Sequence, residues 1–500
     1  MGFNWIVFIL SSIALIGVGV YSNQKLKNQA SSAGEAFLLG GKQIGPFIGA
    51  GTLMATGYSG WGFIGSPGTA YAYGTIEILA NFFFAPAIVF GTLLFANFMR
   101  KNAKESGGLT VPEYLATTHR GTDQQRRLVH FFAGLASFVF LSVYMIGQIR
   151  AVGLVGAQWL GIPEIYASGI LILVVAVFTI QGGLLAVAIT DTLMCIGMLI
   201  AAVIVFVVIL QDVSLVDMFT KLRNVDPQIL NPTSSAPYGR GMFSVFLVFI
   251  YALLFTTTLP YMSVRFLSLK EDIKIHKMVL YMAPMGIILS LIPFVGVYMK
   301  YKQPNLANPD SAMPLFLTTY LSPVVGGIIT LFILFAMMST ISSVLQALAS
   351  SLSYDLFVSV SNKKASSSSD FINRTIVGFV SVWVMILTFA APQGMLNQVA
   401  YIGTGGLIAM FAGPTIMRIL VKADLRSCFA SMVTGLLSNI ILVLAFSVGW
   451  VEAPLIGGLI GSLVYVIMGF ILNGYKRFPD IALENSLNQK SNVSLQFIQK

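Results

Sequence analysis

Four hydroxyl side chains gather within one apolar stretch, Ala336-Met337-Met338-Ser339-Thr340-Ile341-Ser342-Ser343. At helical spacing Ser339, Ser342 and Ser343 share a face, and Thr340 lies beside it. Sodium is a hard cation that binds several oxygens, which hydroxyls and the free carbonyls of an interrupted helix can supply. Serine and threonine also bond back to their own helix or allow helices to pack closely. The pattern therefore predicts either a cation site or a structural role.

A single carboxylate, Asp191, lies roughly two turns inside another apolar stretch, in Thr190-Asp191-Thr192. Inserting a carboxylate at membrane depth costs on the order of 3 kcal/mol, so it needs a partner or water. In the topology predicted below, Asp191 lies toward the same side as the hydroxyl cluster. A cation shared with that cluster is one interpretation, and an interfacial aspartate is the other.

Arg150 is the basic residue placed deep within an apolar span, two residues after Gln148. A guanidinium held away from water favours a bidentate carboxylate partner. This indicates a contact with a substrate carboxylate. An internal partner, either Asp191 or the carbonyl end of a helix, remains the alternative. Glu77 and Glu164 lie near the predicted outer interface, and we expect both to be solvated.

Two stretches of membrane length, residues 44–70 and 239–265, contain residues that interrupt a helix. In the first, the segment from Ala55 to Gly68 holds five glycines from Gly57 to Gly68, together with Pro67. In the second, the interrupting segment is Thr256-Thr257-Thr258-Leu259-Pro260. Each glycine costs a helix about 1 kcal/mol and an interior proline about 3, and the freed backbone groups cannot face lipid. Broken helices of this kind indicate the solute and ion site of a transporter.

The composition is that of a polytopic helical membrane protein: 500 residues, 56% hydrophobic, 10% charged, with a mean hydropathy of +0.84. The net charge of +10 does not indicate a nucleic-acid partner, because the basic residues fall in loops between apolar spans. The two cysteines and three histidines have neither metal-ligand nor catalytic spacing. We therefore expect no enzyme activity, no cofactor and no metal other than sodium.

The hydropathy pattern predicts thirteen spans. Their ranges are 4–21, 44–70, 75–99, 129–160, 163–181, 183–211, 239–265, 276–299, 322–358, 372–391, 396–419, 427–448 and 451–474. The first is read as a membrane helix rather than a signal peptide, since Lys25 and Lys27 follow it. With the N-terminus outside and the C-terminus cytoplasmic, most of the 29 lysines and arginines, Arg265 among them, lie on the cytoplasmic side.

These spans form one predicted transporter domain, residues 1–474, followed by a cytoplasmic tail, 475–500. Core repeats cover about 44–211 and 239–419, and the extra helices are 4–21, 427–448 and 451–474. The two repeats have five spans each, opposite topology and an irregular first span. An alternating-access transporter of the five-plus-five type requires this arrangement. Ser366–Ser369 is expected to be a flexible cytoplasmic segment.

Several short motifs, in the expected order along the chain, resemble the sodium:solute symporter family. They are Leu39-Gly40-Gly41-Lys42-Gln43-Ile44-Gly45-Pro46-Phe47, Ser59-Gly60-Trp61 with Gly65-Ser66-Pro67-Gly68, Gly182-Gly183-Leu184-Leu185-Ala186-Val187 with Thr190-Asp191, Pro260 with Arg265, and Met338-Ser339-Thr340-Ile341-Ser342-Ser343. The resemblance implies a leucine-transporter-type fold, all-α, with two broken helices, in the plasma membrane.

The resemblance also implies which residues bind the ions and the solute. For the main sodium site these are Ala55, Tyr58, Ala336, Ser339 and Thr340. For a second cation site they are Asp191, Ser342 and Ser343, with Ser339 shared. Arg150 lies about two residues from the arginine that binds the substrate carboxylate in sialic acid carriers. The other candidates for solute binding are Gln148, Ser59, Gly60, Trp61 and Thr256.

This chain departs from proline carriers within the family. They have an aspartate where this chain has Gly57, and Trp and Tyr where it has Ala252 and Thr256. Short strings such as Leu259-Pro260-Tyr261-Met262-Ser263-Val264-Arg265 are nearer to pantothenate carriers. The predicted function is therefore sodium-coupled import of a small, carboxylate-bearing solute, pantothenate-like or another monocarboxylate.

Alternatives remain open at this point. Within the same class they are a proline-type or sialic acid symporter, and a symporter coupled to protons through Asp191. In other classes they are a membrane solute sensor and an ion channel. The expected partners are sodium, the solute and the lipid bilayer, with no nucleic acid. A monomer is compatible with this reading, but the sequence does not determine the oligomeric state.

Overall fold

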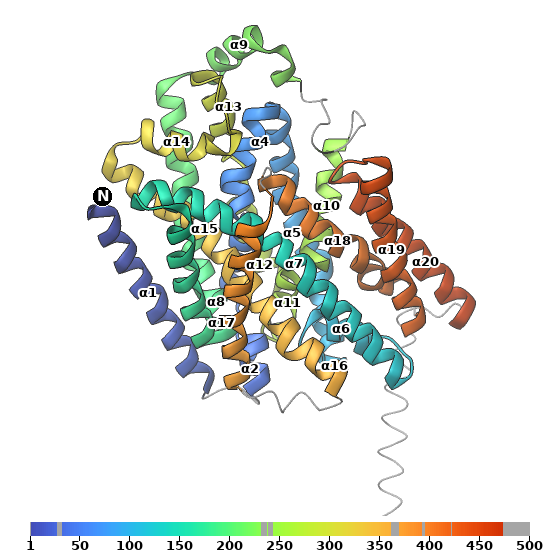
Figure 1. Ribbon diagram of the computed structural model, residues 1–500. Helices are drawn as coiled ribbons and strands as arrows, with labels where there is room; N and C mark the ends of the chain where they lie inside the picture. The colour runs from blue at the N-terminus through green and yellow to red at the C-terminus, as the bar shows by residue number, and fades with distance from the viewer. Residues whose placement is uncertain are drawn as a thin grey trace, which may run out of the picture.

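The computed structural model describes residues 2–27, 33–231, 238, 244–361, 370–392, 396–421 and 423–473, and within these ranges all regular elements are helices (Figure 1). The predicted tail 475–500 and Ser366–Ser369 lie outside the described residues. The longer helices are α1 (Gly2–Lys27), α5 (Thr75–Ser106), α7 (Asp123–Leu160), α8 (Glu164–Asp212), α12 (Ile275–Leu289), α15 (Pro323–Ser350), α17 (Asp370–Ala390), α18 (Leu396–Ile416), α19 (Leu425–Phe446) and α20 (Glu452–Asn473). The shorter helices are α2 (Ala33–Leu39), α3 (Pro46–Gly57), α4 (Ser66–Tyr73), α6 (Val111–Thr118), α9 (Leu215–Val225), α10 (Leu247–Thr258), α11 (Pro260–Leu267), α13 (Phe294–Lys302), α14 (Ala312–Thr319) and α16 (Phe357–Ser361).

The glycine-rich stretch breaks the helix that contains it, as predicted. Helix α3 ends at Gly57, and Tyr58 has the non-helical angles φ −95° and ψ 85°. The chain becomes helical again at Gly60, winds through a π-helix from Trp61 to Gly65, and continues into α4. The break leaves several backbone groups near Tyr58 without helical partners.

The second predicted break is also present. Helices α10 and α11 meet at Leu259 with a bend of 58° between them. Pro260 occupies the first turn of α11, where its missing N–H is tolerated and its ring prevents α10 from continuing. Both predicted breaks, one in each half of the chain, are thus present.

Helix α8 contains two of the predicted spans, 163–181 and 183–211. Its 49 residues would extend about 70 Å as one straight helix, more than twice the hydrocarbon thickness of a bilayer. Gly183 divides the helix, because its φ of 55° and ψ of −151° are not helical. The structure therefore places the junction where the sequence placed it.

The predicted number of spans is not confirmed. Within the described ranges, ten helices are long and apolar enough to cross a membrane, and the bent pair α10–α11 makes at most eleven. The difference from thirteen has a physical reason, because α8 counts once and the fragments on either side of Tyr58 are each too short to count. The orientation of the termini remains a prediction.

The interior of the bundle forms around α3, α8 and α15. Helix α8 packs against α15, α1 and α3, and α7 packs against both α15 and α18. Helix α1 lies along one flank of the bundle, while α19 and α20 lie together along the other (Figure 1). Residues from both broken helices are buried at the centre.

Asp310 connects three segments near the break. It lies in the turn Pro309–Ser311, and its Oδ2 accepts a hydrogen bond from the backbone N–H of Leu396 at 3.1 Å. Its side chain also packs closely against Gly68 of α4, where a Cβ atom would lie 2.3 Å from Oδ1. Asp310 is 5% exposed, and within the described chain its buried Oδ1 has no hydrogen-bond partner.

We predict that Gly183→Ala destabilises the fold. Its backbone region is essentially restricted to glycine, at a cost of about 1–3 kcal/mol for other residues, and a Cβ would lie 2.8 Å from the carbonyl oxygen of Phe37. The matched control is Gly169→Ala in the same helix, whose Cβ would meet only the Met385 methyl at 3.9 Å. We expect thermal unfolding to show a lower midpoint for the first variant and no decrease for the second. Equal midpoints would contradict this account.

We predict that Asp310 makes the free energy of unfolding depend on pH. Burial raises the pKa of Asp310 to about 6, so the folded protein binds this proton more tightly than the unfolded chain does. The stability contributed by this group therefore increases as the pH falls through 6, and is lost as the pH rises. At pH 7.5 the wild-type protein should have a lower unfolding midpoint than the Asp310→Asn variant. At pH 5 the wild-type midpoint should approach that of the variant. A pH-independent difference between the two proteins would contradict the assignment.

Candidate cation site

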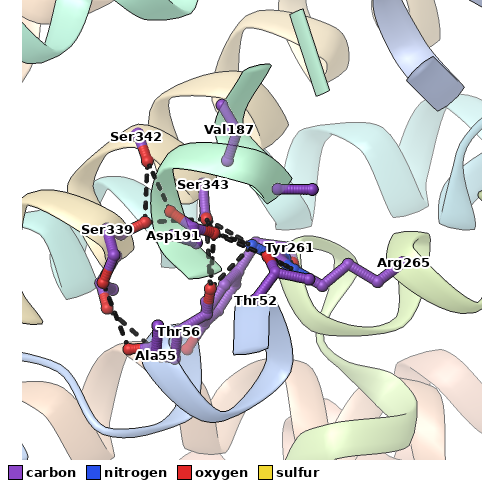
Figure 2. A network of polar contacts seen from close by, with 12 residues as sticks. Thr52, Ala55, Thr56, Val187, Asp191, Tyr261, Arg265, Ser339, Ser342 and Ser343 are labelled. Atoms are coloured by element: carbon purple, nitrogen blue, oxygen red, sulfur yellow. Dashed lines mark hydrogen bonds and ion pairs between the residues drawn. The ribbon is translucent and has the colours of Figure 1, made fainter. Parts of the chain in front are cut away.

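Helices α3, α8, α11 and α15 bring their polar side chains together at the break after Gly57. In Figure 2, Ser339, Ser342 and Ser343 project from α15 toward Asp191 on α8 and toward the C-terminal turn of α3. Each of these side chains is buried, with at most 2% of its surface exposed. The polar groups must therefore satisfy one another.

The first group of oxygens joins α15 to the end of α3. The Ser339 hydroxyl donates to the carbonyl oxygen of Ala55 at 3.3 Å and to that of Ala336 at 2.9 Å. The Thr340 hydroxyl donates to the carbonyl oxygens of Thr56 at 3.2 Å and Ala336 at 3.4 Å. Four of the five residues predicted for the main sodium site thus lie together.

The fifth residue, Tyr58, lies at the break itself. Its side chain extends toward α12, where the hydroxyl shares a 3.0 Å hydrogen bond with Ser290. Any part of Tyr58 in ion binding would therefore come from its backbone carbonyl.

The chemistry of this group fits sodium. It offers neutral carbonyl and hydroxyl oxygens, and a hydroxyl that donates to a carbonyl can rotate and offer its lone pairs to a cation. Across the described ranges, His, Cys, Asp and Glu form no group of three or more that could hold a metal ion. The oxygen set therefore favours a hard monovalent cation over a transition metal.

The second group of oxygens surrounds Asp191, which is fully buried. Its Oδ2 accepts hydrogen bonds from the hydroxyls of Thr52 at 2.7 Å, Thr56 at 3.2 Å and Ser343 at 3.2 Å. Its Oδ1 accepts from Ser342 at 3.4 Å. The residues predicted for the second cation site are thus neighbours.

Arg265 already supplies a positive charge at this second group. Its Nη2 lies 3.0 Å from Asp191 Oδ2, and it also donates to Ser343 at 2.5 Å and to Thr56 at 2.7 Å. Its Nε donates to Thr52 at 2.7 Å, and its Nη1 donates to the carbonyl oxygen of Tyr261. The side chain is 0% exposed. Counting Arg265 among the loop residues was therefore wrong.

Arg150 binds a different part of the protein. Its guanidinium donates to the carbonyl oxygens of Pro392 at 2.6 Å, Ala391 at 2.5 Å and Thr388 at 3.2 Å. Thr388 lies in the last turn of α17, and Ala391 and Pro392 follow directly after the helix ends at Ala390. A cation there satisfies groups that the helix end leaves free. Of the interpretations that the sequence left open, the structure shows the contact with a helix carbonyl end.

Three of the predicted solute residues meet at the break. Gln148 on α7 accepts a hydrogen bond from the backbone N–H of Gly60 at 2.9 Å. One turn earlier, Tyr144 shares a 3.1 Å hydrogen bond with the hydroxyl of Ser59. The hydroxyl of Thr256 donates to the carbonyl oxygen of Ala252 within its own helix at 2.8 Å.

A small aromatic-lined pocket adjoins the break. Among the residues that the structure describes, no charged side chain lines it, and two of its polar groups, Tyr251 and Thr404, bond to each other at 2.7 Å. Its lining residues are Trp61, Phe84, Tyr144, Tyr251, Phe255, Ala400, Tyr401 and Thr404. Of the predicted solute residues, Trp61 alone lines this pocket.

Glu77 differs from its expected solvated state, whereas Glu164 is exposed as expected. Glu77 is only 1% exposed. Its carboxylate accepts hydrogen bonds from Ser66 at 2.5 Å and Asn81 at 2.9 Å, and from the hydroxyl of Tyr238. The sequence could not indicate this burial, because Ser66 and Tyr238 reach Glu77 only through the tertiary fold.

Comparisons with known proteins agree with this geometry. The sequence model of the sodium:solute symporter family matches residues 37–452. "Sodium/proline symporter 2" of Staphylococcus saprophyticus is 26% identical over 519 residues, covering 98% of this chain and 96% of that protein. A solved Na+-coupled sialic acid symporter, substrate-bound and outward-open, aligns with a TM-score of 0.76 at 18% identity over 95% of this chain and 99% of its own. Mhp1, a nucleobase-cation-symport-1 family transporter, gives 0.52 at 15% identity, covering 86% and 95%. These likenesses confirm the leucine-transporter-type fold.

We predict that replacing both Ser339 and Thr340 by alanine weakens sodium binding at least tenfold. The double variant removes the two α15 hydroxyls that donate to the backbone carbonyls of Ala55 and Thr56 at the end of α3. Sodium-dependent thermal stabilisation of the purified protein measures the affinity. The control is Thr330→Ala in the same helix, whose hydroxyl donates to the carbonyl oxygen of Gly326 one turn earlier at 2.6 Å. An unchanged sodium affinity in the double variant would remove these residues from the site.

Proposed function

The chain belongs to the sodium:solute symporter family, and from this membership and the site geometry we propose that it imports a small organic solute by alternating access. Sodium is the coupling ion, and the plasma membrane is the proposed location. A transport family also agrees with the expectation that the protein is not an enzyme. The observation that most directly supports this proposal is the hydrogen bond from Ser339 of α15 to the Ala55 carbonyl beside the break.

In the proposed mechanism, sodium binds first between the end of α3 and the hydroxyls of α15. The ion links Ala55, Ala336, Ser339 and Thr340, and so fixes the direction in which the chain leaves α3. Ser59 and Trp61 follow within six residues of Ala55 and reach the solute side of the break. Each positive charge that crosses 100 mV supplies about 2.3 kcal/mol, so one sodium already drives substantial accumulation.

The aromatic side chains around the pocket suit a solute with an apolar or ring-shaped part. The pocket would have to widen to admit such a solute, because its volume of about 10 Å³ is no more than a single water molecule needs. Proline, named in the staphylococcal relative, and pantothenate both carry such a part next to a carboxylate. Both are therefore candidates, together with other monocarboxylates. Arg150 gives no support for a carboxylate, since α17 holds its guanidinium. Sialic acid, which is hydroxylated over most of its surface, suits an apolar lining less well.

Proton coupling through Asp191 is the second candidate mechanism. Asp191 is buried and forms an ion pair with Arg265. Arg265 and the hydroxyls of Thr52, Thr56 and Ser343 already contact this carboxylate, so a proton bound there would have to displace existing contacts. Sodium coupling at the first group of oxygens is therefore the stronger proposal.

We predict sodium-dependent uptake of radiolabelled proline or pantothenate into proteoliposomes. At fixed pH and with an inside-negative potential, replacing external sodium by choline should abolish uptake. The Ser339→Ala, Thr340→Ala double variant should lose the stimulation by sodium, and Thr330→Ala should keep it. Uptake that persists in choline and follows a pH gradient would replace sodium by protons as the coupling ion.

A further inference from the structure

We propose that a pocket on the predicted cytoplasmic side of the bundle binds a phosphate-bearing anion, either the headgroup of an anionic lipid or a soluble phosphate compound. The pocket lies between the end of α5, the segment that follows α2 and the loop that follows α11. Its volume is about 260 Å³, whereas one water molecule needs about 10–15 Å³. No residue lines both this pocket and the candidate cation site. The inference therefore goes beyond the proposed function and does not depend on it.

Four cationic side chains line this pocket. Arg100, Lys101 and Lys104 come from the last turns of α5, and Lys42 comes from the segment after α2. Among the described lining residues, Glu271 is the one carboxylate. The three cations of α5 lie outside the short motifs by which the sequence resembles the symporter family.

Two of the four positive charges are balanced by carboxylates. Lys104 Nζ lies 2.9 Å from Glu271, and Lys42 Nζ lies 3.2 Å from Glu35, which is outside the pocket lining. The hydrogen bond from Lys104 holds the pKa of Glu271 below its usual range, and the charges of Lys42 and Arg100 lower this pKa further. The positive charges of three segments thus act on the same space.

Arg100 and Lys101 supply the charge that remains. The Arg100 guanidinium donates to neutral acceptors, the carbonyl oxygens of Lys270 and Glu271 at 2.5 Å each and Asn97 Oδ1 at 2.9 Å. Lys101 is exposed, and within the described part of the chain it has no carboxylate partner. The C-terminal end of the α5 dipole offsets about half a charge. The excess positive charge that is left suits a phosphate group, which accepts hydrogen bonds from both lysine and arginine.

The pocket contacts both broken helices at their predicted cytoplasmic ends. Leu267, the last residue of α11, and Leu269 both line it and are buried. The backbone N–H of Lys270 donates to the carbonyl oxygen of Ile44, two residues before α3, at 3.0 Å. Backbone contacts therefore fix the walls of the pocket, and a bound anion would connect α5 to the ends of α3 and α11.

One face of α5 favours a lipid as the source of the phosphate. Phe90, Leu94, Asn97, Lys101 and Lys104 are exposed and follow one another at spacings of three or four residues, so they share a face. This face is apolar as far as Leu94 and cationic from Lys101. A phospholipid with its acyl chains along the apolar part would place its phosphate beside the cations, as in basic pockets that bind anionic headgroups. Cations also gather generally at the cytoplasmic border of membranes, so the test needs a control outside the pocket.

Thermal unfolding of the delipidated full-length protein in a neutral detergent tests this inference. Dioctanoyl phosphatidylglycerol should raise the midpoint saturably, whereas the zwitterionic dioctanoyl phosphatidylcholine should not. The Lys101→Gln, Lys104→Gln double variant should bind phosphatidylglycerol at least tenfold more weakly, and Glu271→Gln should bind it more tightly. The control is Arg127→Gln, Lys277→Gln, which removes two exposed cations that do not line the pocket. It should bind phosphatidylglycerol like the wild type.

Inorganic phosphate distinguishes the two sources. Stabilisation by phosphate that the Lys101→Gln, Lys104→Gln variant loses would support a soluble phosphate compound, and stabilisation by phosphatidylglycerol alone would support a lipid. The inference is overturned if neither probe stabilises the wild type, or if phosphatidylcholine stabilises it equally. It is also overturned if the stabilisation survives in the pocket variant, or if the control variant loses as much affinity. Sodium-dependent stabilisation should be unchanged in all of these variants, so a failure here leaves the proposed function intact.

Discussion

The interruption of α3 after Gly57 is the constraint on which the rest of the site depends. A helix that stops inside an apolar bundle leaves carbonyl oxygens that lipid cannot satisfy. Here α15 satisfies two of them, because the hydroxyls of Ser339 and Thr340 reach Ala55 and Thr56. The same unsatisfied oxygens that require α15 as a neighbour are those that can bind an ion, so one backbone feature determines both packing and chemistry.

Beside this break, the ion pair of Asp191 and Arg265 fixes the relative positions of four helices. A buried pair of this kind gives little net stability, because desolvation of both charges offsets their attraction. Its value lies in specificity, since alternative packings of α3, α8, α11 and α15 would leave a charge unpaired. The hydroxyls of Thr52, Thr56 and Ser343 add directional contacts that a purely apolar interface would lack.

Local rules predicted the features that depend on neighbouring residues. The glycines and prolines located both broken helices, and helical spacing placed Ser339, Ser342 and Ser343 on one face. Contacts between distant segments were beyond such rules. Arg265 lies at the end of an apolar span, where hydropathy cannot distinguish a buried arginine from one in a loop, and Arg150 met the carbonyls of α17, 238 or more residues away. The burial of Glu77 was missed for the same reason.

The short segment from Ala55 to Gly60 is held from two opposite directions. On one side α15 binds Ala55 and Thr56, and on the other Gln148 and Tyr144 of α7 bind Gly60 and Ser59. A change in the contacts on one side of this segment must alter the contacts on the other side, since at most about 20 Å of chain joins the two sets. Thermodynamic linkage then requires reciprocity. In the proposed mechanism, the factor by which sodium strengthens solute binding equals the factor by which the solute strengthens sodium binding, and a variant that weakens the contacts on either side of this segment reduces that common factor.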